Sequence, residues 1–241
     1  MIWDTFNDPL VHNSVESLFE KYVYGDPADG PVGEKYSYCS TGYALLGMII
    51  EEASTMSLGG YFEQEIIESL GLVNTYFKNT PEYPDDVQYK TNRYMEQAPG
   101  QIQNCTDFTN NLASIAMGDI GLFATPYEYA RFYQELLRGN VLDSSTMQLM
   151  LNDEIRIPEE EESYQCLGLE HDKSNVFGDI YWHGGGWFGT LSRTKYFPGS
   201  DVTISINTNG TGFTFHTDET LNRFSSLVDE IEKVTFTGER N

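Results

Sequence analysis

The chain has 241 residues, of which 39% are hydrophobic and 14% aromatic, a composition that supports a globular fold with a sizeable core. Thirty-seven acidic residues against fourteen basic ones give a net charge of -23, which argues against nucleic acid and anionic membranes as partners. No stretch approaches the roughly 18 apolar residues of a membrane span, and the N-terminus lacks the basic and apolar regions of a signal peptide.

The first half of the chain is predicted to be mainly helical. A short amphipathic helix is expected around residues 15–24, after a loop-rich start. Apolar residues then recur at helical spacing through residues 45–53 and again through 58–70, which predicts two packed helices with a C-terminal cap at Gly71. Residues 75–111 are rich in Tyr, Pro, Asn and Gln without periodicity, which predicts an irregular segment.

Two further helices are predicted in the middle of the chain. The run Thr125-Pro126-Tyr127-Glu128 has the pattern of a capping box with proline at the first helical position. A helix should therefore begin there, continue to about Arg138 and end at Gly139. Residues 141–151 predict another short helix.

Beyond Pro158 the hydrophobic pattern becomes typical of strands. The predicted strands cover residues 163–169, 176–182, 191–197 and 202–207, and the turn at residues 198–201 joins the last two into a hairpin. A closing helix is predicted to begin at Thr217-Asp218-Glu219. Its apolar residues are Leu221, Phe224, Leu227, Val228 and Ile231.

Helices, then an antiparallel meander, then a covering helix predict an α+β fold. We expect one domain over residues 1–241, with a mainly helical part at 1–157 and strands plus the last helix at 158–241.

The most informative segment is His183-Gly184-Gly185-Gly186-Trp187-Phe188-Gly189, between two predicted strands. Residues without a Cβ beside a strand let a substrate backbone lie against the sheet, while an imidazole can address the charge of that substrate. Taken alone, His183 is more often a solvated or core histidine than a catalytic one. The adjacent glycines favour the functional interpretation.

A second informative segment is Tyr38-Cys39-Ser40, directly before the predicted helix that contains residues 45–53. Taken alone, Tyr38 would be interpreted as a buried aromatic residue with a satisfied hydroxyl. Cys39 could act as a nucleophile, because thiolates attack readily, but a small buried thiol is the favoured interpretation.

Neither a disulfide framework nor a metal site is predicted, although one disulfide pair could form. The three cysteines, at positions 39, 105 and 166, are an odd number without metal-ligand spacing. The remaining histidines also lack such spacing and receive no role: His12, His171 and His216.

These segments together resemble the serine β-lactamase and penicillin-binding-protein family, in its class C, D-alanyl-D-alanine carboxypeptidase and esterase branch. Residues 33–47 look like the segment around the Tyr-x-Asn motif of that family, and His183-Gly184-Gly185 falls where the family has Lys-Thr-Gly or His-x-Gly. Weaker similarities follow in the family's order at residues 68–72, 118–125, 136–139 and 196–207.

The resemblance implies a β-lactamase/transpeptidase-like fold and acyl transfer on β-lactams, D-Ala peptides or esters, without metal or cofactor. It implies that Tyr38 passes protons and that His183 binds a carboxylate or steadies charge on the tyrosine. The backbone N–H of Gly186 is expected to face a developing oxyanion, with Gly185 beside it. Ser40 stands where the family usually has an asparagine that contacts a substrate amide, so a shorter hydroxyl replaces an amide side chain that both donates and accepts.

The third motif of the family, Ser-x-x-Lys, is expected upstream of the tyrosine motif but is absent from the thirty-seven residues that precede Tyr38. Residues 3–9 look like the family region just downstream of that motif, so we expect the N-terminal strands and the nucleophile helix to be missing. The only literal match is Ser192-Arg193-Thr194-Lys195, in a predicted strand. Positions three apart on a strand point to opposite faces, so this match is not expected to be a catalytic pair.

The expected function is therefore that of a truncated relative of these serine hydrolases, inactive as given. One alternative is a non-catalytic protein that binds a peptide or glycan in the remaining cleft. Another is a fragment of an active hydrolase whose start is missing. An exposed apolar face and sheet edge are expected, and with them self-association or pairing with a separate N-terminal segment. Relatives are commonly periplasmic or extracellular, but the localisation of this chain stays open.

Overall fold

The computed structural model describes residues 15–28, 30–34, 36–77, 91–98, 100–106, 118–158, 160, 162–174, 176–212 and 218–238. The chain forms two compact units. Unit 1 comprises Met1–Gln88, Asp107–Glu128 and Ile155–Glu160, and unit 2 comprises Tyr89–Thr106, Tyr129–Glu154 and Glu161–Asn241. The family-like segment at residues 3–9 and the predicted cap Thr217 lie outside the described residues.

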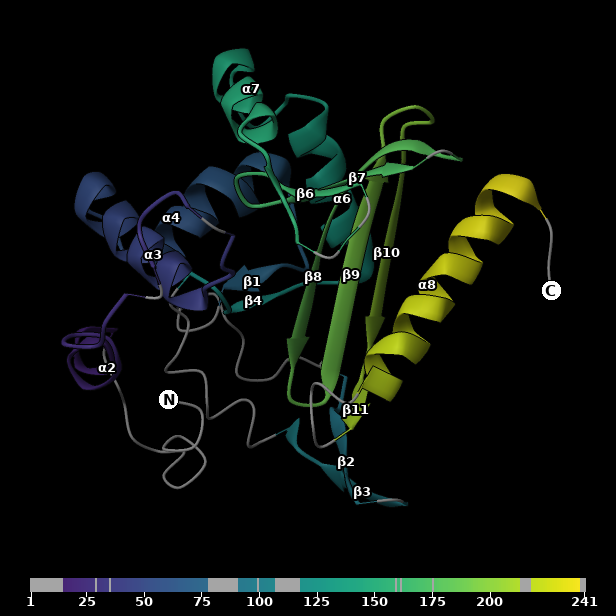
Figure 1. Ribbon diagram of the computed structural model, residues 1–241, viewed down its shortest axis with the longest axis horizontal. Coiled ribbons are helices and arrows are strands. Elements are labelled where there is room, and N and C mark those ends of the chain that lie inside the picture. Colours follow the sequence, from purple (N-terminus) through teal and green to yellow (C-terminus); the bar gives the residue numbers. More distant parts are fainter. Residues whose placement is uncertain are drawn as a thin grey trace. The chain divides into compact units, whose positions relative to one another are not determined.

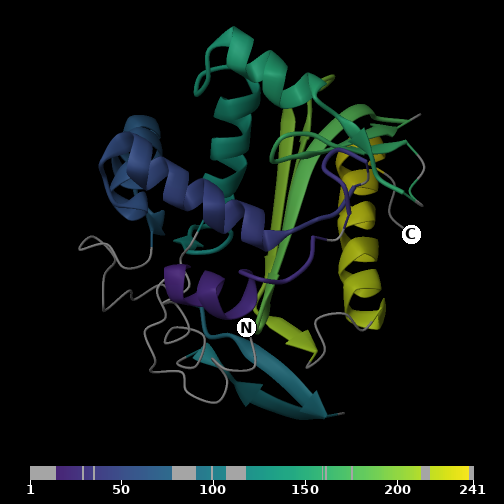
Figure 2. The same cartoon turned by 60° about the vertical axis from the view of Figure 1, so that its left-hand side comes forward.

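Unit 1 is built around two helices that lie beside each other (Figure 2). Its elements are α2 Val15–Tyr22, α3 Ser40–Ser54, α4 Leu58–Phe62, the π-helix η1 Glu63–Glu68, β1 Tyr76–Phe77, β4 Leu122–Phe123 and β5 Ile155–Arg156. Phe19 of α2 packs on Ala44 of α3, and both side chains are buried. The helices predicted at residues 15–24 and 45–53 are therefore confirmed.

The predicted helix at residues 58–70 consists of α4 followed directly by η1. Ser57 caps its N-terminus, because the hydroxyl oxygen accepts from the N–H of Gly60. Its C-terminus has the hydrogen bonds of a Schellman motif, from the N–H of Leu72 to the Ile67 carbonyl and from the N–H of Gly71 to the Glu68 carbonyl. The φ of Gly71 is +60°, so the predicted glycine cap is confirmed.

The boundary between the units falls after Glu128, inside α6 Pro126–Leu137. The predicted start is confirmed, since the N–H of Glu128 donates to the Thr125 hydroxyl. The Glu128 carboxylate is buried and accepts from the N–H groups of Asn74 and the hydroxyl of Thr75. This glutamate therefore fixes the segment after η1.

The end of α6 is the predicted Gly139, whose φ is +80°. The N–H of Asn140 donates to the Glu135 carbonyl, as in a Schellman motif. The short helix predicted next is α7 Ser144–Asn152. Asp143 caps it by accepting from the N–H groups of Ser145 and Thr146.

Unit 2 contains an antiparallel meander in which β6 to β10 follow one another in the sheet (Figure 1). Its strands are β6 Ser163–Gln165, β7 Glu170–Ser174, β8 Gly178–Trp187, β9 Thr190–Phe197 and β10 Val202–Thr208. The predicted β9–β10 hairpin is confirmed, and the antiparallel register pairs Phe197 with Val202. The predicted α+β fold class is therefore confirmed.

The closing helix is α8 Asp218–Thr237, which lies along one face of this sheet (Figure 1). Phe224 and Val228 are buried against Leu191 of β9, with Ile206 of β10 beside them. One predicted member of the apolar face is wrong, because Leu227 is exposed.

Three predictions about strands were wrong in their details. Residues 163–169 do not form one strand, because the chain turns at Gly168, whose φ is +84°, and returns as β7. The strand predicted at 176–182 extends through the glycines to Trp187. The segment predicted to be irregular contains β1 and a hairpin of β2 Tyr94–Ala98 and β3 Gln101–Asn104, to which β11 Gly210–Gly212 adds a parallel strand.

None of the helices in the described ranges combines the length and hydrophobicity that a bilayer crossing requires.

Candidate active site

Tyr38 and Ser40 belong to unit 1, at the start of α3. Tyr38 lies in the segment before the helix, and its side chain is 56% exposed. The next residue, Cys39, has the extended backbone of an N-cap residue but makes no side-chain cap. Ser40 is the first residue of α3 and is also exposed. Tyr38 taken alone was interpreted as buried and Cys39 as a small buried thiol, and both interpretations are wrong, because both residues are exposed.

The hydroxyl of Ser40 makes a hydrogen bond to the carboxyl group of Asp119. Burial raises the pKa of Asp119, and this increase is opposed by backbone hydrogen bonds of Asp119 and Ile120 and by the bond from Ser40. A half-buried carboxyl group with a raised pKa therefore lies directly beside the tyrosine-motif segment. Asp119 was not among the residues expected at the site, and its signal in the sequence was the pair of nearby glycines, Gly118 and Gly121.

Gly118 explains how Asp119 comes so close to the start of α3. An added Cβ at Gly118 would lie 2.4 Å from the backbone oxygen of Tyr43, and the φ of Gly118 is +106°. Only glycine adopts such a conformation and permits such a close approach without strain. The segment of residues 118–121 is therefore shaped to contact α3.

His183 and the glycines belong to unit 2 and lie within β8. The register pairs His183 with Thr194, Gly184 with Arg193 and Gly185 with Ser192, so His183 and Gly185 point to the same face of the sheet. His183 lies within β8 and not between two strands, which corrects its expected position. Gly186 continues the strand opposite Leu191 and is exposed.

The His183 ring is half-buried, and its Nδ1 lies 2.6 Å from the Gly184 carbonyl oxygen. A carbonyl oxygen only accepts, so Nδ1 carries the proton, and in the neutral ring Nε2 has the lone pair. Burial lowers the pKa of His183, and the hydrogen bond to Gly184 opposes this only in part. The ring is therefore neutral at neutral pH, and a cationic imidazole is not the form that unit 2 favours.

Gly185 is required by the neighbouring strand. An added Cβ would lie 2.9 Å from the Oγ of Ser192, so the serine hydroxyl fills the space that a side chain at position 185 would need. A glycine at position 185 therefore makes room for the Ser192 hydroxyl on the face of the sheet that carries His183.

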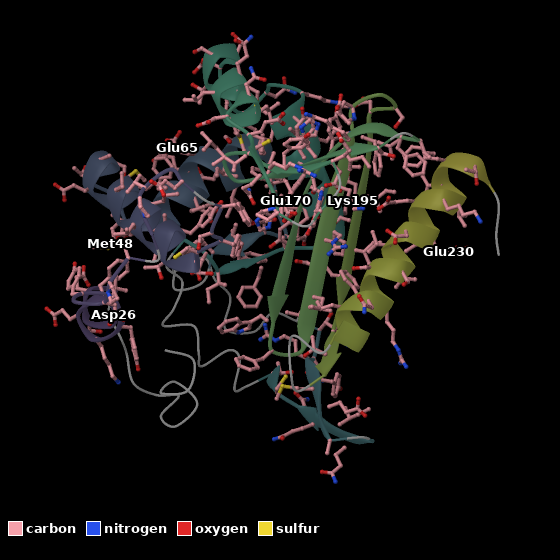
Figure 3. All side chains as sticks on the ribbon, in the orientation of Figure 1. Asp26, Met48, Glu65, Glu170, Lys195 and Glu230 are labelled. Carbon is pink, nitrogen blue, oxygen red and sulfur yellow. The ribbon has the colours of Figure 1, made fainter. Side chains whose placement is uncertain are left out.

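Lys195 lies on the opposite face of β9 from Ser192, as the sequence analysis expected. The ammonium Nζ lies 2.7 Å from Glu232 Oε1 of α8, and both side chains are buried. The Arg193 side chain faces α8 as well, where it donates to Ser225 and lies over the ring of Trp182. Figure 3 shows Lys195 on the sheet and Glu230 on the neighbouring α8. Ser192 and Lys195 therefore do not form a serine–lysine pair.

Comparison with known proteins confirms the expected β-lactamase/transpeptidase-like fold. Residues 3–226 match the Beta-lactamase family, so the chain belongs to the β-lactamase family. It is 28% identical over 212 residues to an N-acetylmuramyl-L-alanine amidase of Bacillus subtilis, an alignment that covers 78% of this chain and 47% of the amidase.

Solved structures show the same fold. A D-stereospecific amidohydrolase from Streptomyces sp. superposes with a TM-score of 0.79 at 20% identity, covering 98% of this chain and 64% of that chain. The octameric penicillin-binding protein homologue from Pyrococcus abyssi superposes with a TM-score of 0.68 at 20% identity. The superposition covers 90% of this chain and 48% of the homologue. The chain thus spans less than half the length of the curated relatives that it matches.

Proposed function

We propose that this chain carries two of the residue groups that β-lactamase-family hydrolases use for acyl transfer, and that its 241 residues by themselves do not form an acyl-enzyme. The two groups are Tyr38 with Ser40 in unit 1 and His183 with Gly185 and Gly186 in unit 2. Family membership supports the first half of this proposal.

The observation that carries the second half is the position of Lys195. A serine hydroxyl attacks poorly unless a neighbouring base takes its proton. The only Ser-x-x-Lys match in the sequence places its lysine in a buried ion pair with Glu232, on the face of β9 away from Ser192. The amine is held by a carboxylate and covered by α8, so it has no access to that serine.

The proposed roles of the remaining residues follow from their chemistry. The phenol of Tyr38 is exposed and can exchange protons with a bound ligand. In the proposed role, the neutral ring of His183 accepts a hydrogen bond at Nε2, because its Nδ1 proton is held by Gly184. Gly186 offers backbone N–H to a carbonyl oxygen of the ligand.

The proposed ligands are small amides and peptides that contain D-amino acids. This class is supported by the names of the relatives, which include a D-stereospecific amidohydrolase and an N-acetylmuramyl-L-alanine amidase. The fold alone does not select among amides, β-lactams and esters.

A second candidate is a non-catalytic binding protein for such peptides or for glycans. The exposed ring of Tyr38 favours it, because an exposed aromatic ring can stack on a ligand without any chemical step. In that case the glycines of β8 would serve to accommodate a ligand backbone against the sheet.

Kinetic and binding assays on the purified chain test these proposals. We expect no hydrolysis of nitrocefin, of a p-nitrophenyl ester or of a D-amino-acid p-nitroanilide above the buffer rate, and no difference between the chain and its Tyr38→Phe variant. Saturable calorimetric binding of a D-Ala-D-Ala peptide without turnover would favour the binding protein. Hydrolysis that disappears in Tyr38→Phe would overturn the proposal of inactivity.

We also propose that the chain associates with copies of itself or with a separate segment. Three apolar side chains of α3 support this, because Leu45, Leu46 and Ile49 are 45%, 51% and 59% exposed. The Pyrococcus abyssi homologue, which is octameric, is a precedent for self-association within the fold.

A further inference from the structure

Three side chains of unit 2, each with a different kind of metal-ligating atom, lie close together. None of them is a residue of the proposed function. The three residues are Glu154, two positions after the end of α7, Cys166, directly after β6, and His171 on β7. One carboxylate oxygen, the thiol sulfur and one imidazole nitrogen all lie within 4.8 Å of one another. Cys166 and His171 are buried, whereas Glu154 is partly exposed. We call this group the Glu-Cys-His cluster.

The imidazole of His171 is held firmly on both sides. Its Nδ1 lies 2.9 Å from Glu154 Oε2, and its Nε2 lies 3.0 Å from Asp179 Oδ1 of β8. The ring stacks on Tyr181 with a centroid distance of 4.5 Å and an interplanar angle of 20°. Nδ1 is therefore aimed at the cluster, while Asp179 holds the opposite nitrogen.

Glu154 is oriented in the same way by a second group. Lys173 Nζ donates to Glu154 Oε1 at 2.8 Å, so the other oxygen, Oε2, is the one that faces His171. The lysine also lies 3.9 Å from the centroid of the Tyr164 ring, which fixes its side chain. The cluster thus has outer partners on both its carboxylate and its imidazole.

We propose that the Glu-Cys-His cluster is a binding site for a divalent cation of intermediate softness, with Zn²⁺ as the matching ion. The ligands would be Glu154 Oε2, Cys166 Sγ and His171 Nδ1, with the fourth tetrahedral position taken by water or a small ligand. Mixed nitrogen, sulfur and oxygen donors suit Zn²⁺ and its neighbours, whereas Mg²⁺ and Ca²⁺ require oxygen donors.

The outer partners support this assignment. A histidine that ligates a metal typically donates its other ring N–H to a carboxylate, which fixes the orientation of the ring. Asp179 occupies that place at Nε2, and Lys173 plays the corresponding part for the carboxylate of Glu154. No metal role was predicted for His171 and Cys166, because the three ligands come from separate elements and their positions in the sequence lack a characteristic metal-ligand spacing.

Coordination of the cation requires the three ligand atoms to adjust their separations and two protons to leave the cluster. Ligand atoms around a tetrahedral Zn²⁺ lie about 3.5 Å apart, so the widest of the three separations, at most 4.8 Å, must shorten by up to about 1 Å, and the 2.9 Å between Nδ1 and Oε2 must lengthen. Without metal, Cys166 is a thiol that donates a hydrogen bond to the Leu151 carbonyl oxygen. The cation replaces this thiol proton and the proton of the hydrogen bond between Nδ1 and Glu154, and both protons leave to solvent.

Titration of the reduced, chelator-treated 241-residue chain with Co²⁺ tests the proposal, because a thiolate ligand gives Co²⁺ a characteristic near-ultraviolet charge-transfer absorption. We expect this absorption to saturate at one equivalent, to disappear on addition of Zn²⁺ and to persist in excess Mg²⁺. Cys166→Ser and Cys166→Ala should abolish it. Asp179→Asn should keep the absorption but weaken binding by about 10- to 100-fold.

The matched control is Cys39→Ser, since Cys39 is the exposed thiol of unit 1 and should not affect the absorption. The proposal is overturned if the absorption survives in both Cys166 variants or if it depends on Cys39. It is also overturned if Zn²⁺ binding is unchanged in Cys166→Ala and His171→Gln, because the bound cation would then belong to the acidic surface. Circular dichroism of each variant confirms that the fold is retained, and the two Cys166 variants guard against a failure specific to one of them.

Discussion

Gly118 is the residue whose identity is most tightly dictated by its surroundings. Its φ is +106°, and a Cβ would lie 2.4 Å from the Tyr43 carbonyl oxygen, which is backbone and cannot rotate away. We therefore predict that Gly118→Ala lowers the free energy of unfolding by at least about 2 kcal/mol, measured by denaturant titration.

The control for that substitution is Gly42→Ala in α3. No atom lies within 4 Å of an added Cβ at Gly42, and its φ is not positive. Alanine in a helix is favoured over glycine by roughly 0.5–1 kcal/mol, so this variant should be as stable as the parent or slightly more stable. Equal stability of the two variants would show that the close approach of Gly118 to α3 is absent in solution.

The hydrogen bond between Ser40 and Asp119 gives a prediction with a definite sign. Burial raises the pKa of Asp119, and the Ser40 hydroxyl opposes that increase by favouring the ionised carboxylate. Ser40→Ala should therefore raise the pKa of Asp119 further, as followed by an NMR titration of its carboxyl carbon. A lower or unchanged pKa in Ser40→Ala would contradict the assigned hydrogen bond.

The raised pKa of Asp119 also affects stability. Because the folded state holds the proton more strongly than the unfolded state, the free energy of unfolding should fall as pH rises from about 4 through the folded pKa. Asp119→Asn should remove this part of the pH dependence.

At the scale of elements, the contact between β9 and α8 depends on a buried ion pair. Lys195 and Glu232 have side chains that are 10% and 6% exposed, and their charged atoms lie 2.7 Å apart. Burial raises the pKa of Glu232, and the hydrogen bond and charge of Lys195 oppose this. The pair thus holds the lysine in place on the sheet face away from Ser192.

Removing one partner leaves the other charge buried without compensation. We predict that Glu232→Gln lowers the free energy of unfolding by about 3–5 kcal/mol, whereas the double variant Lys195→Met with Glu232→Leu recovers most of that loss. Asp229→Asn on the exposed side of α8 is the control and should change stability by less than about 0.5 kcal/mol. A loss below about 1 kcal/mol for Glu232→Gln would mean that the ion pair is open to solvent.

The elements that could be predicted from sequence are those with a strong local signal. The glycines after η1 and α6, the Thr125 cap and the alternating strands β9 and β10 each depend on a few neighbouring residues. The strand β7 was missed because its sequence is charged, and its side chains are satisfied by partners on other elements, such as Glu154 and Asp179.

The candidate site was predictable only in part, for the same reason. Tyr38, Ser40, His183 and the glycines were identified from motifs along the chain, whereas Asp119 and the Glu-Cys-His cluster depend on contacts between distant segments. The strand predicted at residues 176–182 stopped before the glycine run, whereas pairing with β9 continues β8 through it to Trp187.

At the scale of the whole molecule, the exposed apolar side chains of α3 lead to a prediction about mass in solution. If Leu46 and Ile49 mediate self-association, light scattering coupled to size exclusion should report a mass above the 27.3 kDa of one chain. The double variant Leu46→Glu with Ile49→Glu should lower this mass toward that of the monomer. The exposed Ile102→Glu on β3 is a control that should not change the mass. A monomeric parent chain would rule out self-association, and the remaining option is a separate segment.

We propose that the chain by itself does not form an acyl-enzyme, because the one Ser-x-x-Lys match in its sequence holds Lys195 in a buried ion pair with Glu232, away from Ser192. The most direct measurement is the intact mass of the purified 241-residue chain after incubation with a penicillin and with an activated D-amino-acid ester. We predict an unchanged mass in both cases. A covalent adduct of one acyl group that maps to a serine, and that is lost when Tyr38 is replaced by phenylalanine, would contradict the account.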